Sequence, residues 1–270
     1  MDANAEQERR PGFMRRSDRL RHAASTLPLR TASQQPVPIT FASYNIHKAV
    51  GTDRRRDPDR ILAILREIDA DVIALQEADM RFGRRMSVLP LHAIHEHTDY
   101  RPVPFSMRPD SIGWHGNALL VRRDIELIEA APVPLPVLEP RGAIRADLRI
   151  DGCRVRVVGM HLDLSGLRRR HQVRSVLAHA AACSDAMPTV LMGDMNDWAV
   201  RGGCFREFDD NWRVLAPGRS FPSRRPVAAL DRIVVSGECE VVGTGVHRSA
   251  LSALGSDHLP VFASLNLPKN

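Results

Sequence analysis

Residues 38–45, PITFASYN, and residues 71–77, DVIALQE, decide the fold that this sequence predicts. Both are apolar runs of strand length, and each ends in a polar side chain, Asn45 in the first and Glu77 in the second. Between them, Asp57 precedes a proline, which is a typical helix start, and apolar residues follow at helical spacing: Ile61, Leu62, Leu65 and Ile68. A strand, a helix and a second strand with polar strand ends form the usual layout of an α/β active site.

The rest of the chain adds more strands and one long helix. Apolar runs predict strands at residues 116–121, 125–131, 143–150, 155–162, 189–192, 229–235, 240–245 and 259–267. Asp151-Gly152 indicates a tight hairpin between two of them, and a helix is expected at 167–182. No internal repeat or linker interrupts residues 37–270, so we predict one α/β domain there and a flexible basic tail at residues 1–36.

Composition limits the class of protein. The 270 residues are 43% hydrophobic, which is ordinary for a globular chain, and no run approaches the ~18 apolar residues of a membrane-spanning helix. The first residues are charged and lack the apolar core of a secretory signal, so a cytoplasmic location is expected. Four scattered cysteines without a CxxC pair favour reduced core thiols: Cys153, Cys183, Cys204 and Cys239.

The basic charge is unevenly distributed. The net charge is +6, and residues 1–36 supply half of it through seven Arg and four acidic residues. Arginine suits phosphate recognition because its planar donors pair with two oxygens at once. Most of these side chains are nevertheless interpreted as a solvated basic surface.

Polar residues stand at six separate strand ends, where a core strand needs none: Asn45, Glu77, His161, the Asp194/Asn196 pair, Asp231 and the Asp257-His258 pair. A single aspartate after a strand is usually a turn residue. Six such positions indicate that the side chains converge on one rim, because burying unpaired polar groups without a purpose is costly.

These residues stand in motifs that resemble those of the endonuclease/exonuclease/phosphatase superfamily. The motifs occur in the family's order between about residues 39 and 267: Ser43-Tyr44-Asn45-Ile46-His47, Leu75-Gln76-Glu77, Gly159-Met160-His161-Leu162, Gly193-Asp194-Met195-Asn196-Asp197, Leu230-Asp231-Arg232-Ile233 and Gly255-Ser256-Asp257-His258-Leu259-Pro260. The resemblance implies a four-layer α/β sandwich, in which two mixed β-sheets pack face to face with helices outside. It also implies a metal-dependent hydrolase of phosphate esters.

Magnesium is the expected cofactor, with manganese as a substitute. Glu77 offers a hard carboxylate oxygen at a strand end with Asn45 beside it, and the resemblance adds Asp257 to this metal set. A bound magnesium ion would act as a Lewis acid on the phosphate and stabilise the leaving group.

The resemblance also assigns the catalytic residues. Asp194 is expected to orient or deprotonate the attacking water, and the amide of Asn196 to donate to a phosphoryl oxygen. His258, polarised by Asp231, matches the family's Asp-His pair for the developing charge. His161 resembles the second histidine, which hydrogen-bonds the scissile phosphate.

Other positions have weaker support. Asn117 corresponds to a residue at the floor of the family's site, and Arg225 is placed to reach an anionic substrate, so both are predicted to bind substrate. His47 and Lys48 could touch the leaving group or a second phosphate, although surface exposure explains them nearly as well. The alternating histidines at 92, 95 and 97 are interpreted as a solvated loop, because no carboxylate or cysteine completes a zinc site.

The substrate stays open at this stage. A phosphodiester is favoured, with nucleic acid and a phospholipid headgroup about equal, and no obligate protein partner is predicted. Trp114, Trp198 and Trp212 could line a cleft for bases, whereas residues 132–138 are the candidate for peripheral membrane contact. A phosphomonoesterase acting on a small or inositol-type phosphate is the alternative. A non-catalytic module binding nucleic acid or anionic membrane is a further hypothesis, which the complete catalytic set disfavours.

Overall fold

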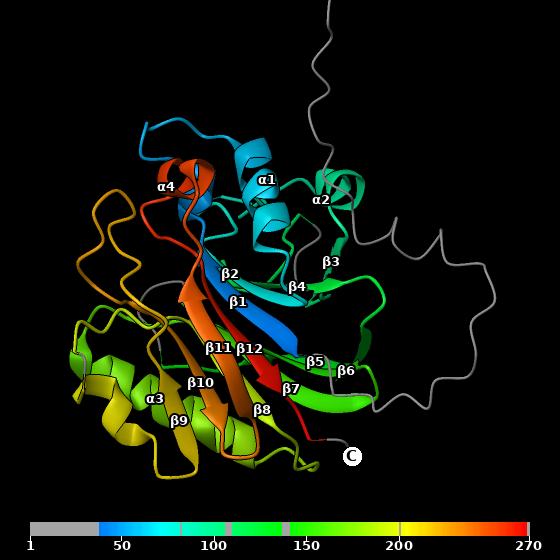
Figure 1. The fold of residues 1–270 in the computed structure, drawn as a ribbon, viewed down its shortest axis with the longest axis vertical. Coiled ribbons are helices and arrows are strands. Elements are labelled where there is room, and N and C mark those ends of the chain that lie inside the picture. Colours follow the sequence, from blue (N-terminus) through cyan, green and yellow to red (C-terminus); the bar gives the residue numbers. More distant parts are fainter. Residues whose placement is uncertain (1–37, 82, 106–109, 137–140, 200, 269–270) are drawn as a thin grey trace, which may run out of the picture. The chain divides into compact units, whose positions relative to one another are not determined.

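Two six-stranded sheets make up the centre of the protein (Figure 1). The computed structural model describes residues 38–81, 83–105, 110–136, 141–199 and 201–268, and the predicted tail at residues 1–36 lies outside them. The first sheet has the strand order β11 (Glu240–Val246), β12 (Val261–Asn266), β1 (Ile39–Asn45), β2 (Val72–Gln76), β4 (Ala118–Arg122) and β3 (Tyr100–Pro102). The second has the order β5 (Glu126–Val133), β6 (Ala143–Ile150), β7 (Cys153–His161), β8 (Thr189–Asp194), β10 (Asp231–Ser236) and β9 (Trp212–Leu215).

Each sheet contains one parallel pair among antiparallel neighbours. β1 runs parallel to β2 in the first sheet, and β7 runs parallel to β8 in the second. The remaining pairings are antiparallel. Both sheets are therefore mixed, as the sequence predicts.

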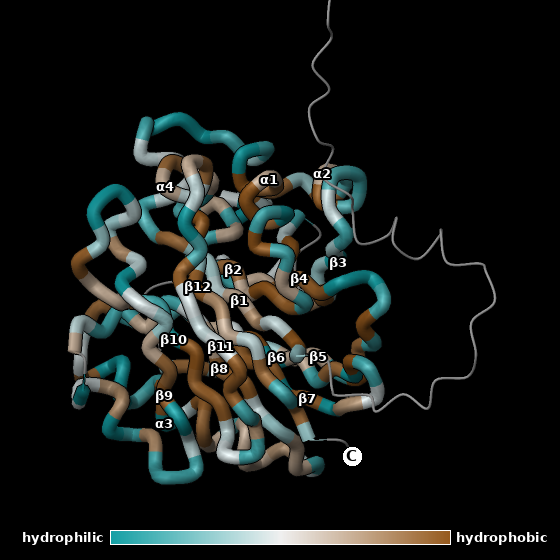
Figure 2. The backbone as a smooth tube through the Cα atoms, in the orientation of Figure 1, coloured by the Kyte–Doolittle hydropathy of each residue, from teal (hydrophilic) through white to brown (hydrophobic). Residues whose placement is uncertain are grey.

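The two sheets pack face to face through alternate residues of their strands. In β1, Phe41 belongs to the core between the sheets, whereas Ala42 and Tyr44 belong to the cluster on the other face. In β8, Met192 points inward and Leu191 outward in the same way. This two-sided burial explains why the central strands are apolar throughout (Figure 2).

Helices cover both outer faces. α1 (Pro58–Ile68), α2 (Leu91–His97) and α4 (Ala250–Gly255) cover the first sheet, and α3 (Gly166–Ala181) with the 3₁₀ helix η3 (Gly203–Glu207) covers the second (Figure 1). α1 begins as the sequence predicts, since the side chain of Asp57 accepts a hydrogen bond from the backbone N of Arg60 at 2.9 Å. The result is the predicted four-layer α/β sandwich.

Several local predictions need correction. The histidines at 92, 95 and 97 lie on helix α2 and not in a loop; α2 buries Ala93 and Ile94 against the first sheet, and this tertiary contact outweighs the missing N-cap side chain. The short elements β3, β9 and α4 were not predicted at all. The four cysteines are free, as expected. Among the described residues, no helix is long and apolar enough to cross a membrane.

Candidate active site

One edge of the two sheets collects the predicted polar residues. β1, β7 and β8 end there at Asn45, His161 and Asp194, because the ends of parallel strands meet at the same edge. Asp231 is the first residue of β10 and pairs with Asp194 across the antiparallel ladder. His258 lies just before β12, which starts beside the end of β1. The strand topology thus brings together residues that are up to 213 positions apart.

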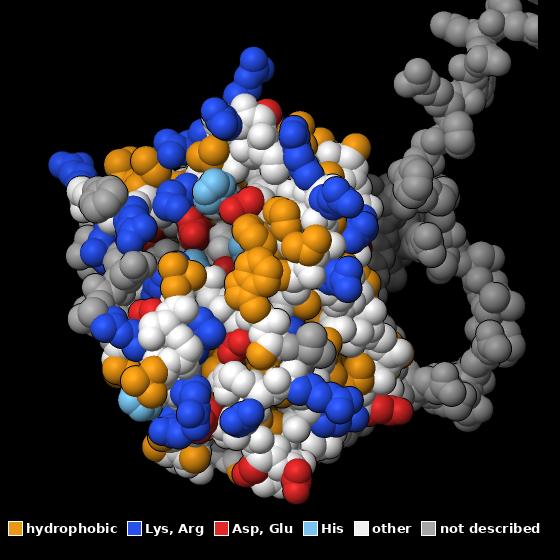
Figure 3. All heavy atoms as spheres, turned by 90° about the vertical axis from the view of Figure 1, so that its left-hand side faces the viewer, with side chains coloured by type: hydrophobic (Ala, Val, Ile, Leu, Met, Phe, Trp, Pro, Cys, Tyr) orange, Lys and Arg blue, Asp and Glu red, His pale blue; other side chains and the backbone are white. Residues whose placement is uncertain are grey.

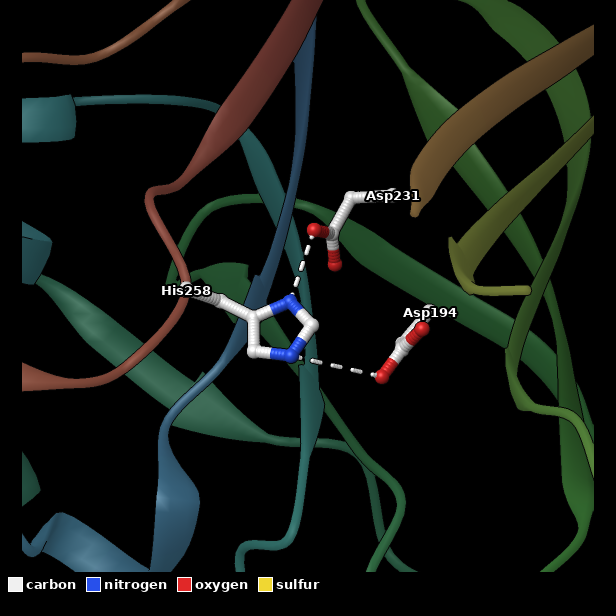
Figure 4. A group of neighbouring side chains, drawn as sticks. All are labelled: Asp194, Asp231 and His258. Carbon is white, nitrogen blue, oxygen red and sulfur yellow. Dashed lines mark hydrogen bonds and ion pairs between the residues drawn. The ribbon is translucent and has the colours of Figure 1, made fainter. Parts of the chain in front are cut away.

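A buried imidazole between two carboxylates is the centre of this edge. His258 Nδ1 lies 2.8 Å from Asp231 Oδ2, and its Nε2 lies 3.7 Å from Asp194 Oδ2 (Figure 4). Asp231 is fully buried and also accepts a hydrogen bond from Ser220 Oγ at 2.5 Å. Phe221 stacks against the His258 ring at 4.9 Å between centroids. The ring is therefore held on three sides, and its Nε2 faces Asp194.

Two further side chains reach the same oxygen of Asp194. Asn45 Nδ2 donates to Asp194 Oδ2 at 3.0 Å, and His161 Nε2 lies 3.4 Å from it. Arg141 Nη1 lies 2.6 Å from His161 Nε2. Because a guanidinium only donates, this Nε2 accepts from Arg141 and does not donate to Asp194 at the same time. We call Asn45, His161, Asp194, Asp231 and His258 the catalytic network.

The charges of the network follow from burial and attraction. Burial opposes a charged His258, but the attraction of Asp231 and Asp194 prevails and raises its pKa to about 10. Burial would raise the pKa of Asp194, yet His258 and the donors around the carboxylate hold it well below its usual range. The pKa of His161 is lowered, chiefly by burial. At neutral pH an imidazolium thus lies between two carboxylates, beside a neutral second histidine.

The low pKa of Asp194 decides between the two roles predicted for it, orienting the attacking water and removing its proton. A carboxylate whose pKa is far below its usual range is a weak proton acceptor. The geometry therefore favours Asp194 as the group that orients an attacking water over the group that removes its proton.

The predicted metal residues lie next to the network. Asn45 Oδ1 accepts the backbone N–H of His47 at 3.1 Å, and the backbone N of Ile46 bonds to Gln76 O, which places Glu77 beside it. Asp257 precedes His258, and its carboxylate lies 3.8 Å from His47 Nδ1. The side chains of Glu77 and Asp257 are 22% and 40% exposed, so incoming cations can reach them.

These residues fit a divalent cation better than the buried cluster does. Asp194, Asp231 and His258 offer three ligand atoms within 4.8 Å of one another, but a metal needs the neutral imidazole. Here the imidazolium is protonated and ion-paired with both carboxylates, so it has no lone pair to give a metal. Glu77, Asp257 and Asn45 instead offer two carboxylates and an amide oxygen, the ligands that magnesium prefers. The Lys48 ammonium paired with Glu77 shows that this carboxylate is presented to a cation.

Several backbone positions in this region are strained. His47, Lys48 and Ala49 form three consecutive residues with positive φ, from 45° to 58°, and Glu77 and Asn196 have φ of 55° and 50°. Such conformations are uncommon for residues other than glycine and cluster at functional sites. The turn at 47–49 directs Lys48 back onto Glu77, which no sequence pattern reveals.

The other predicted positions are placed as follows. Asn196 Nδ2 donates to Leu162 O at 3.0 Å, which uses one of its two amide hydrogens. Asn117 is buried, and its Nδ2 donates to Gly142 O at 3.1 Å, the carbonyl that also accepts the backbone N–H of His161. Arg225 is exposed, and no hydrogen bond or ion pair among the described residues joins its side chain to the network. Its role in binding substrate stays a prediction.

Arg141 is the main residue that the sequence analysis missed. It donates to Leu162 O at 2.6 Å as well as contacting His161. The sequence contained the information needed to find Arg141. The turn at Asp151-Gly152 sets the register of β6 and β7 and pairs Ala143 with Met160. Two positions further along this ladder, Arg141 stands opposite Leu162, beside the histidine.

A pocket opens beside Glu77 and His161. Its lining contains four cationic side chains, one further histidine and a second carboxylate: Lys48, Arg81, Arg85, Arg141, His115 and Asp79. We call it the cationic pocket. On the face shown in Figure 3, acidic and histidine side chains gather in a hollow with basic side chains around it.

Comparison with known proteins identifies the class. The model of the endonuclease/exonuclease/phosphatase family matches residues 42–258, and the chain belongs to this family. Members of this family are hydrolases that act on phosphate esters. The individual relatives say less about function than the family does. The uncharacterized protein YbhP of Escherichia coli K12 is 27% identical over 245 residues, which cover 83% of this chain and 95% of YbhP.

Solved structures share the fold at lower identity. The human nocturnin catalytic domain with bound sulfate is 19% identical with a TM-score of 0.66, covering 86% of this chain and 95% of that one. The Bacteroides thetaiotaomicron mannosyl-6-phosphatase Bt3783 is 20% identical with a TM-score of 0.65, covering 85% and 100%. D. rerio TDP2 complexed with a single-strand DNA product is 15% identical with a TM-score of 0.65, covering 85% and 99%.

Proposed function

We propose that this protein is a magnesium-dependent phosphodiesterase that hydrolyses its substrate by attack of water. The observation that carries the proposal is the buried Asp231–His258–Asp194 arrangement, which holds an imidazolium between two carboxylates at the edge where Glu77 and Asp257 are exposed. Burying three titratable groups is costly for a fold, and their convergence beside accessible carboxylates is typical of a hydrolytic site. Manganese is expected to substitute for magnesium.

The residues of the network divide the reaction between them. Asp194 accepts a hydrogen bond from the attacking water, and Asn45 fixes the carboxylate through its amide. As the new P–O bond forms and the ester P–O bond breaks, the proton that the water loses passes to the departing oxygen. His258, held by Asp231, presents positive charge to the phosphate oxygens as negative charge develops there. Arg141 stands on the adjoining side and donates to a second phosphate oxygen, while His161 accepts a hydrogen bond from its guanidinium and so orients it. When bound by Glu77, Asn45 and Asp257, the metal supplies Lewis-acid polarisation of the phosphate and stabilises the leaving oxygen.

An aromatic shelf beside His258 supports a diester over a monoester. Trp198 is 66% exposed and lies edge-on to Phe221, with 6.3 Å between the ring centroids, and Phe221 contacts His258. Exposed tryptophan at this edge offers an apolar surface to a second organic group on the phosphorus, which a diester has and a monoester lacks. A nucleobase or another planar group suits it.

The candidate membrane segment does not support a lipid substrate. Of residues 132–138, the structure describes 132–136, where Leu135 packs against the core cluster under α3 and Pro136 O accepts a hydrogen bond from Gln172. This part is a packed connector. Nucleic acid is therefore our first choice of substrate, in a cytoplasmic location, and the phospholipid headgroup is second.

Hydrolysis of bis-(p-nitrophenyl) phosphate and of p-nitrophenyl phosphate, each with and without magnesium or manganese, tests the proposal. We expect metal-dependent turnover of the diester, and a fall of about 100-fold or more in Asp194→Asn. Asp185→Asn, which changes an exposed aspartate paired with Arg154, is the matched control and should keep full activity. Turnover of the monoester alone would make the protein a phosphatase, and an active Asp194→Asn would exclude the mechanism.

A further inference from the structure

Part of the cationic pocket has no role in the proposed hydrolysis. It adjoins the catalytic edge on two sides, because Lys48 pairs with Glu77 and Arg141 contacts His161. Its far side is formed by Arg81, Arg85 and His115. A substrate whose single phosphate group binds at the catalytic network would give Arg81, Arg85 and His115 no role.

The lining carries an excess of positive charge. Four cationic side chains face two carboxylates, Glu77 and Asp79, so the balance is four minus two, or +2, with the histidines neutral. Asp79 is buried and accepts a hydrogen bond from Ser111 Oγ at 2.7 Å.

The cations are close enough to repel one another. Lys48, Arg81, Arg85 and Arg141 all line this one pocket. Gathering like charges destabilises a fold unless an anion offsets them. A bound dianion would replace repulsion by charge-assisted hydrogen bonds, for which the planar arginine fork is suited.

The backbone holds the far side in a defined shape. Arg85 Nη1 lies 3.4 Å from His115 Nδ1, and both residues adopt positive φ, 52° and 50°. Gly116 continues the turn with φ of 81°, where an added Cβ would lie 3.7 Å from the Cα of Glu77. Two strained segments from different parts of the chain therefore meet here, and the turn at 115–116 packs directly on the metal residue.

We propose that the cationic pocket binds a second phosphate group of the substrate, so that the enzyme prefers esters with two phosphates close together. Adjacent phosphates of a nucleic-acid strand and the phosphates of a small bisphosphate share this chemistry. The inference rests on the proposed function for the site of hydrolysis, but binding of the second phosphate does not require turnover.

Isothermal titration calorimetry in EDTA tests the binding apart from catalysis. The probes are thymidine 3′,5′-bisphosphate and thymidine 5′-monophosphate, which differ by one phosphate. We expect the bisphosphate to bind the full chain at least tenfold more tightly, about 1.4 kcal/mol. In Arg85→Ala, and separately in Arg81→Ala, this preference should fall below about threefold. Arg149→Ala removes a half-exposed arginine paired with Glu126 on the β5–β6 edge and should keep the preference, which controls for unspecific attraction.

The outcomes separate the two proposals. Equal affinity for both probes in the unaltered protein, or a preference that survives in both Arg81→Ala and Arg85→Ala, overturns the second-phosphate site. A preference that these variants abolish, in a protein that hydrolyses no phosphate ester with any divalent metal, supports the pocket and refutes the proposed function. Circular dichroism of each variant checks that the fold is kept, and comparison with dinucleotide and glycerol bisphosphate ligands then distinguishes the two sources of paired phosphates.

Discussion

Replacing Asp231 by asparagine should remove the positive charge of His258 without changing the shape of the site. Asparagine is nearly isosteric, and because Ser220 Oγ and His258 Nδ1 contact the same oxygen of Asp231, an amide nitrogen in that position has one hydrogen for each of them. Its amide then donates to His258 Nδ1, so the imidazole becomes neutral and carries its proton on Nε2. The carboxylate is the nearer of the two that hold the imidazolium, at 2.8 Å against 3.7 Å for Asp194.

The size of the effect follows from the pKa of His258. This pKa is about 10 in the folded protein against the ordinary 6.5, and each tenfold in an equilibrium corresponds to ~1.4 kcal/mol. The two carboxylates together therefore stabilise the charged ring by a few kcal/mol, and the nearer one supplies the larger part. Losing about 3 kcal/mol from a charge that faces the phosphate lowers kcat/KM by about 100-fold.

A pH profile of kcat/KM for bis-(p-nitrophenyl) phosphate between pH 6 and 10.5 measures this. In the unaltered protein, activity should persist until His258 loses its proton near pH 10. In Asp231→Asn the alkaline limb should move down to about pH 7 or below, because burial lowers the pKa of His258 and only the more distant Asp194 opposes it. Asp185→Asn is the control. Unchanged kcat/KM and an unmoved alkaline limb in Asp231→Asn would refute the assignment of a charged His258.

Three further predictions concern the metal, the pH and the packing. Glu77→Gln should raise the magnesium concentration for half-maximal activation by about tenfold or more, whereas the exposed Glu238→Gln should not, as an activation titration would show. In EDTA, the melting temperature should fall between pH 7 and pH 10. The pKa of His258 is raised above its unfolded value, so its contribution to stability is complete below 6.5 and is lost as the pH approaches 10; a flat curve contradicts this. Gly193→Ala should destabilise the fold by about 3 kcal/mol, because the added Cβ would lie 1.9 Å from the carbonyl O of Met160 on β7. Gly243→Ala, where nothing lies within 4 Å, is the control in thermal unfolding, and equal stability of the two variants would rule out the clash.

The long apolar runs were enough to predict most of the fold. β1 and β2 are buried on both faces, so their composition identifies them without help from distant residues. Short elements with mixed composition were missed for the opposite reason. β9 is only partly buried and lies at a sheet edge, so it has no distinctive pattern, and helix α2 owes its stability to the sheet beneath it.

Helix α3 shows a subtler limit. Its bounds were predicted closely, but Gln172 was not expected to be buried, and it lies fully inside the protein. Its Oε1 accepts the backbone N–H of Asp163 at 2.9 Å, and its Nε2 donates to Pro136 O at 3.2 Å. A polar residue on an apolar helix face is satisfied here by two loops, and such partners are set by tertiary structure alone.

The candidate site was likewise predictable only in part from the sequence. Strand ends fix where a polar residue stands along its own strand, and this is why Asn45, His161 and Asp194 were all predicted as site residues. Which of them touch depends on the packing of one sheet on the other. Asn45 ends a strand of the first sheet and Asp194 a strand of the second, and their 3.0 Å hydrogen bond crosses the interface between the sheets. This bond joins the residue expected beside the metal to the carboxylate expected beside the water. A shift of one sheet against the other would therefore break this bond and disturb both proposed roles at once, so the apolar contact between the sheets positions the candidate site as well as stabilising the fold.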